Sequence, residues 1–206
     1  MSYKISDSRI EKKTPRFLPK ASQSGFSIIE VLVAILILSI GMLGAVGMQA
    51  AAMQANKESR NQAVAITFAR ELAEKMRGNK AIAIQSTAIA NPYLMDTTLN
   101  ATPIIATPST NCFLNGCTSN TDIATWDVAD LQERLQRALP TPRIKVCFDQ
   151  TPFDASGQAQ WTCSDTGDIA VLKMSWTRKN TAGTLEFASS SGVPVVVVPL
   201  TAGSVQ

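Results

Sequence analysis

The sequence contains no histidine among its 206 residues. Histidine is the commonest general base in enzymes and a frequent metal ligand, so its absence removes His-based catalytic triads and His-based metal sites. The chain also shows neither a phosphate-binding glycine loop nor a paired nucleophile and base. We therefore expect no enzymatic activity, no catalytic residue, no cofactor and no bound metal.

Charge is scarce in the early part of the chain, where Glu30 is the only charged residue between Lys20 and Lys57. The apolar run after Glu30 continues through Ala55, for about 25 residues or roughly 38 Å at helical rise. A bilayer's hydrocarbon core is about 30 Å thick, so a helix over this run is long enough to span it. An ionised carboxylate in that core costs on the order of 2–3 kcal/mol, so Glu30 needs an explanation.

Positive charge is concentrated at the start of the chain. The net charge is +3, and the basic excess lies largely in the first twenty residues, at Lys4, Arg9, Lys12, Lys13, Arg16 and Lys20. Basic residues before a membrane span hold that side of the chain in the cytoplasm. This distribution argues against a nucleic-acid surface on the folded part. Without the motif that follows, residues 1–25 would be interpreted as a disordered cytoplasmic tail.

The segment Gly25-Phe-Ser-Ile-Ile-Glu30 joins the basic region to the apolar run. A basic leader ending in Gly, then Phe, then Glu at the fifth following position and a spanning helix resembles the N-terminal signature of type IV pilins and pseudopilins. Over residues 24–50 the amino-acid sequence is most similar to the PilV group of minor pilins, also called type IV pilus modification proteins. The resemblance implies an α+β fold in which a long N-terminal helix packs on a C-terminal antiparallel β-sheet head.

The same resemblance implies a processing reaction and an assembly contact. Prepilin peptidase, an aspartyl protease in the membrane, would cut between Gly25 and Phe26 and then methylate the new amino group of Phe26. Glu30 would meet the N-terminal amine of a neighbouring subunit. That pairing makes physical sense, because a buried charge tolerates hydrocarbon when an opposite charge accompanies it.

Two other interpretations of this region remain open at this point. A secretory signal would have an apolar core of about 7–15 residues and a small-residue cleavage site, which Ala50-Ala51-Ala52 would supply. The apolar core here is longer than that and opens with a glutamate. The second alternative is a plain membrane anchor in which Glu30 is incidental.

The apolar run contains Gly41, Gly44 and Gly47 at a spacing of three. Each glycine weakens a helix in water by about 1 kcal/mol, but small residues allow close approach of helices in a bundle. Many major pilins carry a helix-breaking proline near the last of these positions. We expect a locally weak helix at Gly47 rather than an obligate break.

Four segments follow from these patterns. Residues 1–25 form the leader, residues 26–55 the transmembrane and assembly half of the long helix, and residues 56–78 its amphipathic half, with apolar positions at helical spacing. The helix should stop near Gly78-Asn79. Residues 79–206 then form a periplasmic globular head.

Within the head, residues 79–125 lack clear periodicity and are predicted to be a long connecting region. Residues 126–139 form a short amphipathic helix that Pro140 ends. Residues 143–200 alternate as strands with tight turns, which favours an antiparallel meander. Its expected strands are Arg143–Phe148, a returning Gln158–Cys163, Ile169–Arg178, Thr184–Ala188 and Val193–Leu200.

The chain has four cysteines, Cys112, Cys117, Cys147 and Cys163. Their spacing and the lack of histidine argue against a zinc site, and an even number of cysteines beyond an export segment indicates disulfides in an oxidising compartment. Three pairings exist, of which we favour Cys112–Cys117 and Cys147–Cys163 because each closes a short loop. The second disulfide would then cross-link the first two strands of the sheet.

Four aspartates lie near the predicted turns, at Asp149, Asp154, Asp165 and Asp168. A calcium site needs several converging oxygen ligands, but these residues do not have the spacing of an EF-hand loop. We expect them to be solvated turn residues.

These observations predict a minor pilin that acts in pilus initiation or at the pilus tip. Its expected partners are other minor and major pilins, prepilin peptidase and the inner-membrane assembly platform. It would cross the bacterial inner membrane once, with a periplasmic C-terminal head, before joining the pilus. The alternatives are a type II secretion pseudopilin, which shares the signature, and a membrane-tethered receptor or enzyme that never assembles.

Overall fold

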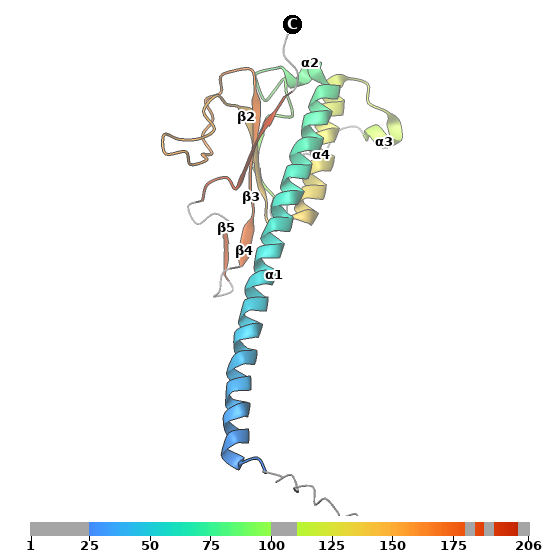
Figure 1. The fold of residues 1–206 in the computed structure, drawn as a ribbon. Coiled ribbons are helices and arrows are strands. Elements are labelled where there is room, and N and C mark those ends of the chain that lie inside the picture. Colours follow the sequence, from blue (N-terminus) through green and yellow to red (C-terminus); the bar gives the residue numbers. More distant parts are fainter. Residues whose placement is uncertain (1–24, 100–110, 180–183, 188–191, 202–206) are drawn as a thin grey trace, which may run out of the picture. The chain divides into compact units, whose positions relative to one another are not determined.

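The structure is a computed structural model that describes residues 25–99, 111–179, 184–187 and 192–201. The expected leader, apart from Gly25, lies outside the described residues. The chain divides into two compact units, Met1–Ala50 and Ala51–Gln206. In chain order (Figure 1) the elements are α1 (Ile28–Gly78), α2 (Lys80–Ala83), β1 (Met95–Thr98), α3 (Cys112–Asn115), α4 (Asn120–Ala138), β2 (Arg143–Phe148), β3 (Ala170–Ser175), β4 (Thr177–Lys179), β5 (Leu185–Phe187) and β6 (Val196–Leu200).

The first unit consists, in its described part, of residues 25–27 and the N-terminal half of α1. Every described side chain from 25 to 50 is exposed, although almost all of them are apolar. By length and composition, α1 is the one helix among the described residues that is able to cross a membrane. The helix is continuous through Gly47 because its backbone hydrogen bonds do not depend on side chains.

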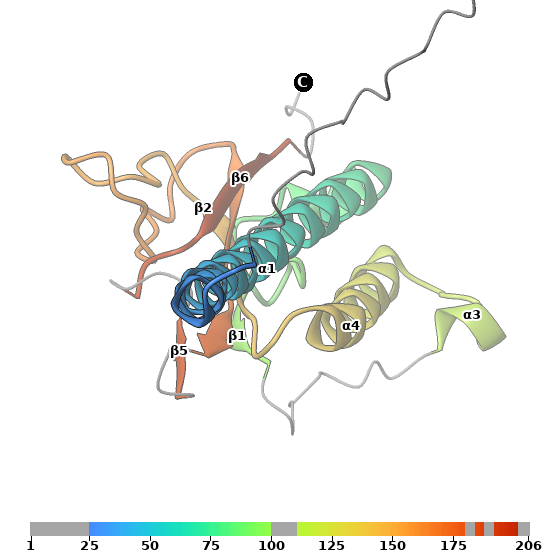
Figure 2. The ribbon, with the colours of Figure 1, turned by 60° about the horizontal axis from the view of Figure 1, so that its bottom comes forward.

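In the second unit, the C-terminal half of α1 contributes a stripe to the core. The buried residues recur every three or four positions, as expected for one face of a helix, and are Asn61, Ala65, Phe68, Ala69, Leu72, Ala73 and Met76. Helices α1 and α4 lie side by side (Figure 2), and their buried faces join the sheet in one hydrophobic core. A helix packed on an antiparallel sheet confirms the predicted α+β fold.

The main sheet has the strand order β1-β2-β3-β6, and every neighbouring pair is antiparallel. β3 lies inside the sheet, between β2 and β6, and all six of its residues are buried. Val146 of β2 and Val198 of β6 flank Leu172 of β3, so apolar side chains line up across three strands. β4 and β5 form a separate antiparallel pair.

The connecting region predicted for residues 79–125 has more regular structure than expected. It contains α2, β1, α3 and the first turn of α4, and β1 forms one edge of the main sheet. The predicted sheet over residues 143–200 therefore missed a strand. β1 has four residues and pairs with β2 across more than forty positions of sequence, so no local periodicity reveals it.

The returning strand predicted for Gln158–Cys163 is wrong. This segment makes one isolated bridge, between Phe153 and Ala159, and β2 pairs instead with β1 and β3. Asp154 bends the chain locally, because its side chain accepts hydrogen bonds from the backbone N–H groups of Ser156 and Gln158 at 2.8 and 2.9 Å. Both edges of β2 are already occupied, so no site for a further strand remains there.

Helix α4 begins at Asn120, earlier than the predicted start at residue 126. The hydroxyl of Ser119 accepts a hydrogen bond from the backbone N–H of Asp122 at 3.1 Å, which caps the first turn. The prediction relied on the leucine stripe, which starts later than this polar cap. The helix ends at Ala138, just before Pro140, where a proline cannot continue it.

Candidate processing and assembly site

Gly25 and Phe26 lie just outside the long helix. α1 begins at Ile28, and residues 25–27 have no regular secondary structure. The Phe26 side chain is 83% exposed, and a Cβ placed on Gly25 would meet no atom within 4 Å. The peptide bond between the two residues is therefore not locked into helical hydrogen bonds, which is the state in which a protease can bind the backbone.

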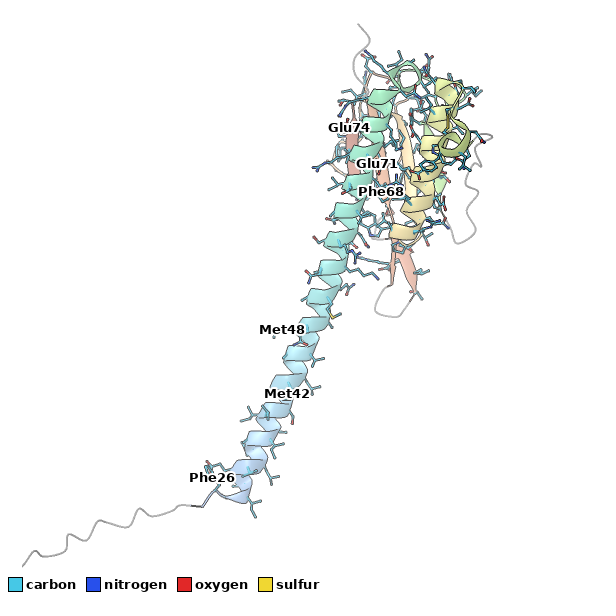
Figure 3. The ribbon with its side chains drawn as sticks, turned by 90° about the vertical axis from the view of Figure 1, so that its right-hand side faces the viewer. Phe26, Met42, Met48, Phe68, Glu71 and Glu74 are labelled. Atoms are coloured by element: carbon cyan, nitrogen blue, oxygen red, sulfur yellow. A yellow bond between two sulfur atoms is a disulfide. The ribbon has the colours of Figure 1, made fainter. Side chains whose placement is uncertain are left out.

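Glu30 occupies the first turn of α1. In Figure 3 this end of the helix is marked by the label of Phe26. The Ser27 carbonyl accepts the backbone N–H groups of Glu30 and Val31 at 3.0 and 3.3 Å, so the turn is closed directly before the carboxylate. A negative charge is favourable at this end of a helix because the unpaired N–H groups give it a partial positive charge. Phe26 and Glu30 both line one hollow of about 450 Å³ on the helix surface, which apolar side chains otherwise line.

The surface around Glu30 is apolar and uncovered within the described part of the chain. Met42 and Met48 project from the helix and Phe26 lies just before its start (Figure 3); the two methionines are 63% and 72% exposed. A continuous apolar surface of this length is not stable in water, so it requires lipid or other helices around it. The arrangement is one exposed carboxylate on a helix that is otherwise suited to hydrocarbon.

The three glycines of the apolar run also have free space around them. A Cβ added to Gly41, Gly44 or Gly47 would meet nothing within 4 Å. No packing inside this chain's described residues therefore requires glycine at these positions. Small residues at these positions would allow another helix to pack closely against this surface.

The structure has the disulfides Cys112–Cys117 and Cys147–Cys163, the pairs favoured from loop length. Because Gln158–Cys163 is not a strand, the second bridge ties β2 to the long loop before β3 rather than to a neighbouring strand. Cys147 and Cys163 lie close to the Asp149 carboxylate. This cluster does not suit a metal, because both sulfurs are used in the disulfide and the carboxylate is paired with a lysine.

That lysine is Lys173, in the middle of β3, and the pair is the main feature that sequence reasoning missed. Lys173 Nζ lies 2.5 Å from Asp149 Oδ2, and neither side chain is exposed. Lys173 Nζ also donates to the Thr162 carbonyl at 2.7 Å, while Asp149 Oδ1 accepts the Ser164 N–H at 3.2 Å. The pair therefore anchors the same loop that the disulfide holds.

The expectation that Asp149 is a solvated turn residue is wrong. Burial by itself would raise the pKa of Asp149, but the Lys173 ammonium and two backbone N–H groups outweigh it and hold the pKa below its usual value. The available signal was Lys173 itself, since a charge inside an otherwise apolar strand requires a buried partner.

Polar contacts also connect α1 and α4. Arg134 of α4 forms an ion pair with Glu71 of α1 through both of its terminal nitrogens, and its guanidinium lies 5.4 Å from the Phe68 ring centre. Asp127 of α4 accepts Lys75 Nζ at 2.7 Å and the Tyr93 hydroxyl at 3.0 Å. Burial and the Asp127 charge raise the pKa of Tyr93, so the hydroxyl stays protonated and donates. These contacts hold the two helices in register.

The described chain combines a long N-terminal helix, whose first half is apolar and exposed, with an α+β unit that contains the second half of that helix. Two family models match the chain: the type IV pilin Tt1218 family over residues 47–129, and the prokaryotic N-terminal methylation motif over residues 20–46. The chain is therefore similar to type IV pilins over residues 47–129 and to the methylation motif over the residues before them. The comparisons with curated proteins and with solved structures gave no match.

The methylation motif covers Gly25, Phe26 and Glu30, and the type IV pilin match begins directly after it. The motif supports processing of the chain by prepilin peptidase. The long apolar helix and the motif together fit a membrane-anchored pilin. Type IV pilins are structural proteins rather than enzymes.

Proposed function

We propose that this chain is a minor pilin of a type IV pilus, cut after Gly25 by prepilin peptidase and methylated on Phe26. It acts in the initiation of pilus assembly or at the pilus tip. The observation that carries the proposal is the position of Glu30, a lone carboxylate at the start of an exposed apolar helix and about one turn from the future N-terminus. The match to the methylation motif at the same residues supports it.

Cleavage changes the electrostatics of this end of the helix. Hydrolysis of the Gly25–Phe26 bond gives Phe26 a free amino group, which is protonated at neutral pH. In hydrocarbon, the Glu30 carboxylate of one subunit and the amine of another each lose their solvation, and pairing offsets that cost. Because amine and carboxylate are offset along the helix axis, the pair also sets the stagger between neighbouring subunits.

The proposal implies a location and a set of partners. The apolar half of α1 crosses the bacterial inner membrane, and the head with its two disulfides faces the periplasm, where disulfides persist. The partners are prepilin peptidase, the inner-membrane assembly platform, and other minor and major pilins. In the pilus, the apolar helix surface exchanges lipid for neighbouring helices.

The direct test of processing is mass spectrometry of the protein from its native envelope. The expected mature chain begins at Phe26 and carries one additional methyl group on its amino nitrogen. Gly25→Val, which adds bulk beside the scissile bond, should leave the chain uncut. A mature N-terminus at any other residue would overturn the proposal, and an uncut Met1 would favour a tethered receptor or enzyme.

The test of the assembly role is a charge-specific substitution at Glu30. Glu30→Gln keeps the shape of the side chain but removes its charge, so we expect normal cleavage and methylation with strongly reduced incorporation into pili. Glu30→Asp, which keeps the charge, is the matched control and should retain more incorporation than Glu30→Gln. Incorporation of Glu30→Gln at the level of the unaltered protein would contradict the pairing.

The type II secretion pseudopilin shares every residue of this motif, so the partners must decide between the two assemblies. The processed protein should co-purify from membranes with other minor pilins. Co-purification with components of a type II secretion system, and not with pilins, would assign it to that system instead.

A further inference from the structure

The β4–β5 hairpin carries apolar side chains that the head leaves uncovered. All three residues of β5 are exposed, and the side chains of Leu185 and Phe187 are 64% and 40% exposed. Their pairing partners across the hairpin are Lys179 and Thr177, so Leu185 and Phe187 lie on the same face. A two-stranded hairpin has little stability of its own, so its position depends on what holds it.

The hairpin is held against the part of α1 that follows the apolar run. Met53, Lys57, Thr177 and Arg178 are among the residues that line one hollow of about 300 Å³ between the hairpin and the helix. Figure 1 shows β4 and β5 beside this part of α1. Just before β4, the Trp176 indole N–H donates to Glu58 Oε2 at 3.3 Å.

The charges around the hairpin favour an anionic partner. Arg178 and Glu186 form an ion pair at 3.5 Å across the hairpin, and Glu58 accepts the Trp176 indole N–H. The two nearby acidic groups therefore already have partners. Lys57 and Arg60 are exposed and form no ion pair with any residue that the structure describes.

The sequence position of this surface fixes its distance from the proposed membrane span. Lys57 is the first charge after Glu30, and a helix rises roughly 40 Å between these two positions. A bilayer is about 30 Å thick in its hydrocarbon core and about 40–45 Å with its headgroups. With the membrane span proposed above, residues 53–60 of α1 follow the span at the level of the headgroups.

We propose that the hairpin patch, defined as Met53, Lys57, Arg60, Leu185 and Phe187, docks on the phospholipid surface beside the protein's own membrane span. The apolar side chains enter the boundary between headgroups and acyl chains, and the two basic side chains meet lipid phosphates. The inference rests on the membrane anchoring proposed above. It gives the head a defined resting position on the membrane before assembly.

The test is site-specific photocrosslinking of the full chain in nanodiscs that contain phosphatidylglycerol. A benzoylphenylalanine at Phe187 should form lipid adducts on illumination. The same residue at Phe113 is the matched control, because Phe113 is 87% exposed but lies on α3, within the Cys112–Cys117 loop. We expect lipid adducts at position 187 at a yield several-fold above that at position 113.

Three outcomes would overturn the inference: no lipid adduct at either Phe187 or Leu185, equal yields at positions 187 and 113, or adducts at 187 only with a second protein chain. The last result would assign the patch to subunit contacts. Extraction of the protein with carbonate tests the anchoring separately. A chain that resists extraction but forms no adduct refutes the docking alone, whereas an extractable chain refutes the anchoring itself.

Discussion

At the scale of single residues, two carboxylates lie in apolar surroundings but differ in whether they have a charged partner in this chain. Asp149 is buried, and its partner Lys173 lies within the same chain at 2.5 Å. Glu30 is exposed on a helix suited to hydrocarbon, and the structure describes no ion pair for it within its own chain. Asp149 therefore stabilises the head, whereas the proposed role of Glu30 is to select a neighbouring subunit.

Asp149→Asn should destabilise the head by about 3–5 kcal/mol, because it leaves the Lys173 ammonium buried without its counter-ion. The free energy of unfolding, measured by urea titration of the full chain in detergent, checks this. The control is Glu133→Gln, which breaks the largely exposed pair between Glu133 and Arg137. That change should cost less than about 1 kcal/mol. Equal effects of the two substitutions would show that the buried pair contributes little.

The same pair gives the stability of the head a pH dependence with a defined sign. The folded-state pKa of Asp149 lies below its unfolded value, so its contribution is complete above about pH 4 and is lost as the pH falls through the folded pKa. The loss of stability on acidification should be smaller in Asp149→Asn. An identical acid profile in both proteins would assign the effect to other groups.

At the scale of elements, α1 has two halves with different surfaces. Its apolar half exposes every side chain from 28 to 50, while its second half buries a stripe against α4 and the sheet. A change in the first half therefore has no packing consequence within the described chain. For the proposed pilin, we expect the effects of such a change to arise in lipid or between subunits.

Gly44→Leu tests this separation. The added side chain meets nothing within 4 Å of its Cβ in this chain, and leucine favours a helix more than glycine by about 1 kcal/mol. Membrane insertion and the unfolding of the head should therefore be unchanged. Incorporation into pili should fall, because a larger side chain keeps neighbouring helices apart.

The matched control for that substitution is Val46→Leu, which enlarges an exposed apolar side chain in the same half of the helix. Incorporation of this variant should remain close to that of the unaltered chain. Equal incorporation of both variants, measured by immunoblotting of sheared pili, would show that the glycines have no role between subunits.

At the scale of the whole molecule, processing would reverse the sign of the net charge. Residues 1–25 contain six of the 19 basic residues and two of the 16 acidic ones, so 13 basic and 14 acidic residues remain after Gly25. The full chain has an isoelectric point near 8.7. The mature chain should focus below neutral pH, and isoelectric focusing in detergent distinguishes the two forms.

Gly25→Val provides the control for this measurement, because an uncut chain should keep the basic isoelectric point. A single basic form in membranes that contain active prepilin peptidase would contradict cleavage after Gly25. Two forms in the unaltered protein would report the fraction that has been processed.

Local patterns determined much of this protein. The apolar run, the position of Glu30 and the helical spacing before Gly78 are properties of adjacent residues, and they predicted the long helix. The class of fold was implied by the resemblance to type IV pilins that Gly25, Phe26 and Glu30 carry. Where the prediction failed, the deciding contacts were distant in sequence: β1 has too few residues to show a period, and β2 bonds to β1 and β3 rather than to Gln158–Cys163.

Contacts between distant parts of the folded head determine which charges are buried and which residues hold the loop before β3. The sequence around Asp149 is typical of an exposed turn. Its carboxylate is nevertheless buried, because it contacts Lys173 of β3 and the backbone of Ser164 in the preceding loop. A helix is specified by hydrogen bonds within a few residues, so the sequence alone reveals it. A sheet and a buried ion pair join residues far apart in the chain, so they emerge only when the whole head has folded.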